Sequence, residues 1–288
     1  MKWTVEELKK SRFPAKLGEI PEPPKKLFLV GQMPEPETKF LAVVGSRKYS
    51  EYGKEACEKL VSGLSGYPVA IVSGLAIGID SIAHRLALRA GLKTVAVPGS
   101  GLGEKTIYPP TSRRLAEEIV EAGGALLSEF LPDQKAAPWT FPRRNRIMAG
   151  LSDAVLVVEA EMKSGTLITA RLALDYNRDV LAVPGSMFSP NAEGPHFLIK
   201  NGATPIRTAE EILLALGFEA KGTQKSMEEV LRICSQEEKE IVSALSSPKT
   251  RDELSEEINR PLCDINITLS MLEIKGVIKE SLGEISLR

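Results

Sequence analysis

The chain has 288 residues, and its formal net charge at pH 7 is −1. This length exceeds the usual range of about 100 to 200 residues for one domain, so two domains are expected. The near-neutral charge argues against a protein that coats duplex nucleic acid through its overall charge. The three cysteines, Cys57, Cys234 and Cys263, form no C-x-x-C pair, so neither a disulfide framework nor a metal site is expected. No stretch has the apolar length of a signal peptide or a membrane span, which favours a cytoplasmic protein without membrane contact.

Residues 1–38 are rich in Pro, Lys and Glu and are expected to form an N-terminal arm laid over the main domain, with one strand-like piece at Leu27–Val30. Residues 39–216 alternate between short apolar runs and helical patterns. This alternation predicts an α/β domain, in which a parallel sheet carries helices on both faces. The expected strands lie at 40–44, 69–72, 94–97, 125–130, 154–160, 180–183 and 203–206.

An arginine cluster precedes the expected strand at 154–160. A helix is predicted from Pro142 to Leu151, because the fixed φ of proline suits the first helical position. Arginines 143, 144 and 146 then lie in the first turn, where cations oppose the helix dipole. The cluster is therefore better explained by an external anion than by helix stability. Helical spacing also places Arg144 on the side of the apolar stripe, which directs it towards the sheet.

The same strand leads into a helix through a Lys-Ser-Gly-Thr sequence at 163–166. Ser164 or Thr166 can cap this helix, and its free N–H groups would form an anion site at the carboxyl edge of the sheet. An ordinary strand-to-helix turn with a capping serine explains this loop equally well.

Several glycine-containing turns follow a predicted strand and precede a helix. They should therefore gather on one edge of the sheet and form a groove lined by backbone; the glycines are Gly45, Gly74, Gly78, Gly99, Gly101 and Gly165. None of these turns has the spacing of a dinucleotide-binding or P-loop signature, so no nucleotide cofactor is expected.

The composition changes after residue 216. Residues 217–227 resemble a linker, and residues 228–288 read as three helices followed by two short strands, the arrangement of a winged-helix domain. From residue 224 onward there are 9 Lys and Arg against 13 Asp and Glu, a net charge of −4. Such a module is poorly suited to neutralising phosphates. We expect it to contact protein or to be structural.

Taken together, the motifs resemble those of the DNA-processing protein A family, also called DprA or Smf, over about residues 27–216. The motifs are VGSR (44–47), SGLAIGID (73–80), YPP (108–110), FPRRNRIMAGLS (141–152), VEAEMKSGTLITARLAL (158–174), VPGS (183–186) and NGAT (201–204). The resemblance implies an extended Rossmann-like domain that binds single-stranded DNA and forms a homodimer. It also implies protection of incoming DNA and loading of a RecA-type recombinase in natural transformation, with no catalytic step.

The candidate DNA-binding residues come from these motifs and from the expected sheet edge. Arg47 follows a strand end, where its guanidinium can bind a phosphate or form a surface salt bridge. Phe141 can stack on a base or staple the helix, and Arg143 occupies a variable position and is expected to be solvated. The full candidate set is Gly45, Ser46, Arg47, Gly74, Gly78, Phe141, Arg144, Asn145, Arg146, Lys163, Ser164, Gly165 and Thr166. Aromatic residues make up only 5% of the chain, so backbone contacts and weak sequence preference are expected.

One residue departs from the family pattern, and a second function remains possible. Ile77 stands where the family often has Arg or Lys, so one phosphate contact is missing. The alternative function is a nucleoside-monophosphate phosphoribohydrolase of a related Rossmann group. Those enzymes use a P-G-G-x-G-T turn, whereas the equivalent stretch here, EAEMKSGT, lacks the glycine pair.

Overall fold

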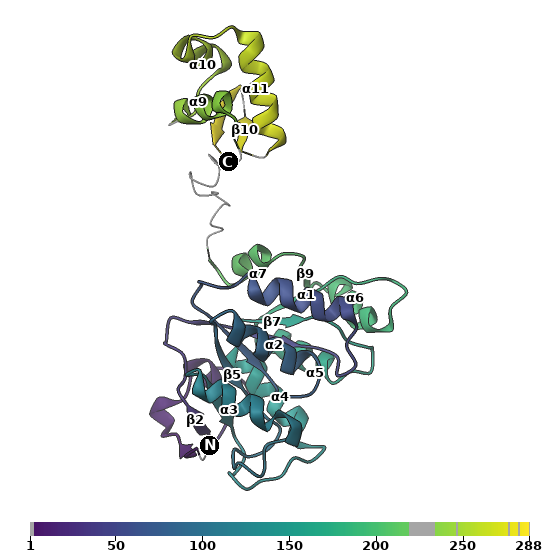
Figure 1. Ribbon diagram of the computed structural model, residues 1–288. Helices are drawn as coiled ribbons and strands as arrows, with labels where there is room; N and C mark the ends of the chain where they lie inside the picture. The colour runs from purple at the N-terminus through teal and green to yellow at the C-terminus, as the bar shows by residue number, and fades with distance from the viewer. Residues whose placement is uncertain (1–2, 219–233, 246, 276, 282, 288) are drawn as a thin grey trace. The chain divides into compact units, whose positions relative to one another are not determined.

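The computed structural model describes residues 3–218, 234–245, 247–275, 277–281 and 283–287. The chain forms two compact units, residues 1–219 and 220–288 (Figure 1). Most of the predicted linker at 217–227 lies outside the described residues. The first unit is built on one sheet, and the second unit contains a separate helical bundle with a small β-ribbon.

The sheet of the first unit has nine strands in the order β1-β2-β6-β5-β4-β3-β7-β8-β9. The strands are β1 (Glu6–Glu7), β2 (Phe28–Gly31), β3 (Lys39–Val44), β4 (Val69–Ser73), β5 (Lys93–Ala96), β6 (Ala125–Ser128), β7 (Ala154–Val157), β8 (Asp179–Ala182) and β9 (Thr204–Pro205). The pairs from β6 to β9 are parallel, which confirms the predicted α/β class. The prediction of a purely parallel sheet was wrong at one edge, because β2 pairs antiparallel with both β6 and β1.

Helices cover both faces of this sheet (Figure 1). One face carries α1 (Glu51–Ser62), α2 (Ile79–Arg89), α3 (Arg113–Glu121) and α7 (Ala209–Ala215); the other carries α4 (Thr140–Leu151), α5 (Thr166–Asp175) and α6 (Glu193–Lys200). Short 3-10 helices lie at Lys10–Arg12, Ala15–Gly18, Pro110–Ser112 and Pro190–Ala192. Because the strands are apolar on both faces, helices cover both faces of the sheet, and the unit has three layers.

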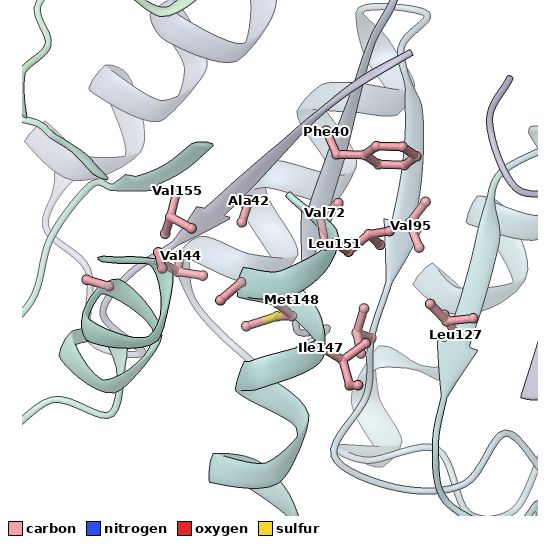
Figure 2. Packing of buried hydrophobic residues seen from close by; sticks show 14 of the residues in the cluster. Phe40, Ala42, Val44, Val72, Val95, Leu127, Ile147, Met148, Leu151 and Val155 are labelled. Atoms are coloured by element: carbon pink, nitrogen blue, oxygen red, sulfur yellow. The ribbon is translucent and has the colours of Figure 1, made fainter. Parts of the chain in front are cut away.

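The side chains of β3 alternate between the two halves of the core. Ala42 and Val44 face α4, while Leu41 and Val43 face α1 and α2. Figure 2 shows the first set beside Met148 of α4 and Val155 of β7. Burying one such aliphatic side chain contributes roughly 1.5 to 3 kcal/mol. The predicted core stripe of α4, Ile147, Met148 and Leu151, is buried as expected.

Helix α4 begins two residues before the predicted start at Pro142. The Thr140 hydroxyl accepts the Ala137 N–H at 3.1 Å and donates to the Gly99 carbonyl at 2.5 Å, which holds the chain at the helix start. Pro142 still lies in the first turn, where its missing N–H has no intrahelical partner. The following strand is also shorter than predicted, because residues 158–160 leave the β7 ladder.

The N-terminal arm is built into the core of the first unit. The predicted strand at Leu27–Val30 appears as β2, and Leu17 and Ile20 are buried in the same cluster as the apolar face of α4. The arm therefore extends the sheet and covers α4.

Asp153, before β7, connects the arm to the sheet. Its carboxylate accepts the Phe40 N–H at 2.8 Å and pairs with Lys16 and Lys39. Burial alone would raise the pKa of Asp153, but the Lys16 hydrogen bond, the Phe40 N–H and the two lysine charges together lower it below 3.8. A carboxylate with a depressed pKa stabilises the fold above its unfolded value, about 3.9, and this contribution is lost as the pH falls.

Asp153→Asn is expected to lower the free energy of unfolding by about 1 kcal/mol at pH 7, because it removes the negative charge that pairs with Lys16 and Lys39. The difference from the unsubstituted protein should shrink as the pH falls through the pKa of the folded carboxyl. Urea unfolding at pH 7 and at low pH measures both effects. Asp133→Asn, at an exposed position, is the matched control. If the difference in free energy of unfolding between Asp153→Asn and the unsubstituted protein stayed constant with pH, the stabilising role of the Asp153 charge would be contradicted.

The second unit contains three helices, α9 (Gln236–Ala244), α10 (Arg251–Ile258) and α11 (Leu262–Ile274), and a ribbon of β10 (Ile278–Ser281) and β11 (Glu284–Leu287). Capping boxes at Ser235 with Glu238 and at Thr250 with Glu253 begin α9 and α10. The predicted order of elements is present, and the winged-helix assignment itself stays a prediction. In the described parts of both units, every helix is too short or too polar to cross a bilayer.

Candidate nucleic-acid interface

A cavity of about 370 Å³ lies where the strand order of the sheet reverses. After β3 the chain builds β4, β5 and β6 on one side of β3, and it later builds β7, β8 and β9 on the other. The helices that follow β3 and β7 cover opposite faces, so their loops diverge and leave a crevice at the carboxyl ends of these strands. Open α/β sheets bind ligands at such points. Loops 45–48 and 161–166, together with α4, line the cavity.

The loops around the cavity are tied to one another. The Thr166 hydroxyl donates to the Gly45 carbonyl at 3.1 Å, which joins the loop after β7 to the loop after β3. The Ser46 carbonyl accepts the Ile79 N–H at 3.2 Å, which joins the β3 loop to α2. Gly78 permits this approach, because it has φ of +89° and a Cβ there would lie 2.4 Å from the Ser46 carbonyl oxygen. These contacts pre-form the cavity.

The first turn of α5 differs from the predicted anion site. Its backbone N–H groups already have acceptors at 3.2 Å: Ser164 Oγ for Thr166, Ser164 O for Leu167 and Gly165 O for Ile168. These N–H groups are therefore not free as predicted, and the binding of an anion at this turn stays a prediction. The exposed cation of the same loop, Lys163, remains available to a ligand.

Arg144 points from α4 towards the sheet, as predicted, and its side chain is buried. Nη1 donates to the Val97 carbonyl at 2.5 Å, and Nε donates to Oδ1 of Asn145 at 3.1 Å. The guanidinium lies against Gly74, where a Cβ would come within 1.9 Å of Nη1. Gly74 is therefore needed to admit Arg144, and Arg144 connects α4 to the ends of the strands.

Asp80 is the buried carboxylate of this cavity. Burial raises its pKa above the ordinary value, although the charge of Arg144 and the amides of Ala76 and Gly74 act in the opposite direction. Asp80 accepts the Gly74 N–H at 3.1 Å from within the first turn of α2, so it holds the loop after β4 and does not cap its helix. Burial lowers the pKa of Arg144 to about 10, so this arginine remains cationic at neutral pH.

The cavity lining has more cationic than anionic side chains. The cations are Arg47, Lys48, Arg144 and Lys163, and the carboxylates are Asp80 and Glu161. Asp80 is engaged by a backbone amide, whereas Arg47, Lys48 and Lys163 are exposed. An anionic ligand is therefore favoured over a cationic one.

Arg47 stacks on Phe141. The guanidinium carbon lies 5.6 Å from the ring centroid, a cation–π geometry. Within the described residues no carboxylate forms an ion pair with Arg47. Phe141 also contacts Tyr108, with centroids 5.9 Å apart, and packs on the backbone at Gly99. Phe141 thus positions Arg47 at the mouth of the cavity, where the guanidinium can still bind an anionic ligand.

Ten predicted site residues line the cavity: Gly45, Ser46, Arg47, Phe141, Arg144, Asn145, Lys163, Ser164, Gly165 and Thr166. Gly74 and Gly78 support it through the close approaches described above. Sequence reasoning missed Lys48, Glu161 and Thr169, which also line it. The position of Lys48 beside Arg47 in the same turn was the available signal.

Arg146 is turned away from this cavity. It is buried, Nη1 donates to the Glu22 carbonyl at 2.5 Å, and Nη2 pairs with Glu129. Its guanidinium therefore joins the N-terminal arm to the strand-end segment after β6, and it is absent from the lining of the cavity. This geometry gives Arg146 no place in the cavity, and its predicted contact with DNA stays untested. Arg143 is exposed, as expected, and forms an ion pair with Glu129 at 3.3 Å.

Comparisons with known proteins agree with this architecture. A model of the family described as DNA recombination-mediator protein A matches residues 5–217. The chain is 46% identical over 206 residues to Protein Smf of Escherichia coli, which covers 72% of this chain and 54% of that protein. It is 41% identical over 206 residues to DNA processing protein DprA of Streptococcus pneumoniae, covering 72% of each chain. The matched region thus spans about half the length of the Escherichia coli relative.

Two solved structures are similar to the first unit. The X-ray structure of DNA processing protein A from Streptococcus pneumoniae has a TM-score of 0.68 at 38% identity and covers 75% of each chain. A structure describing the single-stranded DNA binding mode of DNA processing protein A from Helicobacter pylori has a TM-score of 0.65 at 30% identity, covering 75% of this chain and 98% of that one. The family match, the sequence identities and the shared fold show that this chain belongs to the DNA recombination-mediator protein A family.

Proposed function

We propose that the chain binds the sugar-phosphate backbone of single-stranded DNA at the switch-point cavity and acts in DNA recombination. One observation carries this proposal: a pre-formed cavity at the strand ends with exposed cations at its mouth, which have no ion-pair partner among the residues that the structure describes. A phosphate favours such a site because charge-assisted hydrogen bonds from arginine are strong and directional. The relative from Helicobacter pylori, whose single-stranded DNA binding mode has been described, supports the choice of polymer.

The residues divide into contacting and positioning groups. Arg47, Lys48 and Lys163 are exposed and contact phosphates. Arg144 and Asn145 are buried and hold the cavity wall, with Asn145 Nδ2 donating to the Gly165 carbonyl at 3.4 Å. Contacts to the backbone carry no base information, so binding should depend weakly on sequence.

The role in recombination follows from family membership. We propose that the bound strand is protected and passed to a RecA-type recombinase during natural transformation, without a catalytic step. Two copies of the chain would present two cavities to one strand, and a homodimer therefore gains avidity on a polymer.

The alternative, a phosphoribohydrolase acting on nucleoside monophosphates, has one supporting observation. A cavity of about 370 Å³ is the size of a small-molecule site. Its carboxylates are Asp80, which is occupied by the Gly74 amide, and Glu161, which is exposed. Release of adenine from AMP would favour the enzyme, whereas DNA binding without base release favours the mediator.

Binding isotherms with single-stranded and double-stranded oligonucleotides at several salt concentrations test the proposal. We expect preference for the single strand, and a truncated chain of residues 1–223 should retain that binding nearly unchanged. The deleted part carries a net charge of −4, so it offers little to phosphates. Strong loss of binding on truncation would instead place the DNA site in the second unit.

A further inference from the structure

The loop between β3 and α1 is anchored on both sides of Arg47. On one side, the Ser46 carbonyl accepts the Ile79 N–H of α2 at 3.2 Å. On the other side, Nδ2 of Asn191 donates to the Lys48 carbonyl at 2.9 Å, although Asn191 lies 143 positions further along the chain. Arg47 and Lys48 are exposed. Their side chains therefore reach solvent from a backbone that two distant segments hold.

Glu159, just after β7, holds the end of the same loop. Its carboxylate is buried and accepts the Ser50 N–H at 2.9 Å and the Ser50 hydroxyl at 2.5 Å. The Ser50 hydroxyl in turn accepts the Gly53 N–H at 3.1 Å and caps α1. A buried carboxylate is costly unless it is hydrogen-bonded. Glu159 is satisfied by neutral donors of this loop and by Nδ2 of Asn191 at 3.4 Å, so the loop, Glu159 and Asn191 form one network.

Asn191 is itself fixed by its backbone. It lies in the 3-10 helix Pro190–Ala192, and its carbonyl accepts the Ala160 N–H at 2.8 Å. Ala160 is followed by the loop that carries Lys163 on the other wall of the switch-point cavity. Asn191 therefore connects the two loops that carry the exposed cations. Among the described residues it is not part of the cavity lining, so a bound strand at this site would be influenced by Asn191 only through the loop.

We propose that Asn191, supported by Glu159, is a positioning residue for DNA binding. It holds the backbone at Lys48, so that the side chains of Arg47 and Lys48 are already directed at phosphates before the strand arrives. This inference rests on the proposed function and deepens it. A loop that is ordered in advance loses less conformational entropy when a ligand binds. Without the Asn191 hydrogen bond, the strand itself must order the loop, and the affinity falls.

The experiment is a double-mutant cycle between Asn191→Ala and removal of the two cations, with the full chain throughout. The dissociation constant for an oligothymidylate is measured at low salt, where variants with fewer cations still bind measurably. Asn191→Ala alone should weaken binding by roughly 2- to 10-fold, the range for the net loss of one hydrogen bond. In a chain that already carries Arg47→Ala and Lys48→Ala, it should change the dissociation constant by less than about 2-fold, because no positioned cation remains.

Hydrogen exchange without DNA measures the loop directly. Asn191→Ala should speed the exchange of the backbone amides of residues 46–50, because local opening becomes easier once an anchor is removed. Exchange in β4 should stay unchanged, which shows that the fold is intact. Asn191→Asp keeps the size of the side chain but places an oxygen in place of the donor at the Lys48 carbonyl. It should produce both effects, and it supplies the test if Asn191→Ala does not fold.

Ser65→Ala is the matched control. The Ser65 hydroxyl donates to the Ala90 carbonyl at 2.9 Å, so this variant also removes one side-chain hydrogen bond to a backbone carbonyl. Ser65 lies before β4, at the edge of the sheet opposite the switch-point cavity. The variant should leave the affinity for the strand and the exchange of residues 46–50 unchanged.

The outcomes separate the positioning role from the proposed function. Unchanged affinity or unchanged loop exchange in Asn191→Ala overturns the positioning role and leaves DNA binding standing. An equal loss of affinity with and without the two cations also overturns it, because that loss is not transmitted through Arg47 and Lys48. Failure of the unsubstituted protein to bind the strand overturns the proposed function and the positioning role together.

Discussion

Replacing Arg47 with alanine is expected to weaken binding of single-stranded DNA by roughly 10- to 100-fold, because a hydrogen bond to a charged group contributes about 1.5 to 3 kcal/mol. The loss should be the same for every base sequence. The slope of log K against log salt should flatten by roughly 0.7 for each phosphate contact removed. Isotherms at several salt concentrations measure both quantities. Lys163→Ala should have the same two effects. In the double variant, the slope of log K against log salt should flatten by about twice as much as in either single variant.

The structure offers a matched control for Arg47. Arg89 is exposed and ends α2, the helix that runs from the strand ends beside the cavity to the opposite edge of the sheet. Arg89→Ala removes the same charge at a distance from the site, so it should leave affinity and slope nearly unchanged. If both variants lost the same affinity, binding would depend on overall charge and the cavity would not be the site.

The second large effect concerns stability. Arg146→Ala is expected to lower the free energy of unfolding by about 3 to 5 kcal/mol, because the Glu129 carboxylate loses its buried partner and keeps the exposed Arg143. The side chain of Glu129 is only 5% exposed and pairs with Arg146. Burial raises the pKa of Glu129 despite Arg146 and Arg143, so removing Arg146 raises it further. A carboxyl with a raised pKa is protonated more readily in the folded state, which removes its unpaired charge. The difference in free energy of unfolding between Arg146→Ala and the unsubstituted protein should therefore become smaller as the pH falls. Denaturant unfolding at two pH values measures this.

Arg143→Ala tests the neighbouring partner of the same carboxylate. The Arg143 side chain is 55% exposed, so its loss should cost within about 1 kcal/mol. Replacing the pair together, with Arg146→Met and Glu129→Leu, should recover much of the stability, since no buried charge is left unpaired and Arg143 is exposed.

DNA binding provides the second measurement for Arg146. At a temperature where Arg146→Ala is folded, its affinity for single-stranded DNA should equal that of the unsubstituted protein. A stable variant with lost affinity would contradict the structural role and return Arg146 to the DNA site.

Local patterns in the sequence determined the class of the fold and the position of the site. Strands such as 40–44 are short and apolar throughout, and glycine turns follow them, so both buried faces and the strand ends could be predicted. Because the carboxyl ends of parallel strands share one edge, the loops at 45–48 and 163–166 were expected to meet. The switch-point cavity confirms that they do. The family was also recognisable from the sequence, because each of its motifs is an unbroken stretch of residues.

Contacts between distant segments decided the remainder. Arg144 and Arg146 are two positions apart on α4, about 200° around the helix, so they cannot face the same surface. Helical spacing directed Arg144 towards the sheet, but the partners of Arg146 depend on where the fold places Glu129 and the arm at Glu22, which helical periodicity does not encode. The antiparallel edge likewise depends on β2 meeting β6, nearly 100 residues further along the chain. Local sequence determines backbone conformation and burial, whereas the partner of a charged or aromatic side chain depends on which segments the fold brings together.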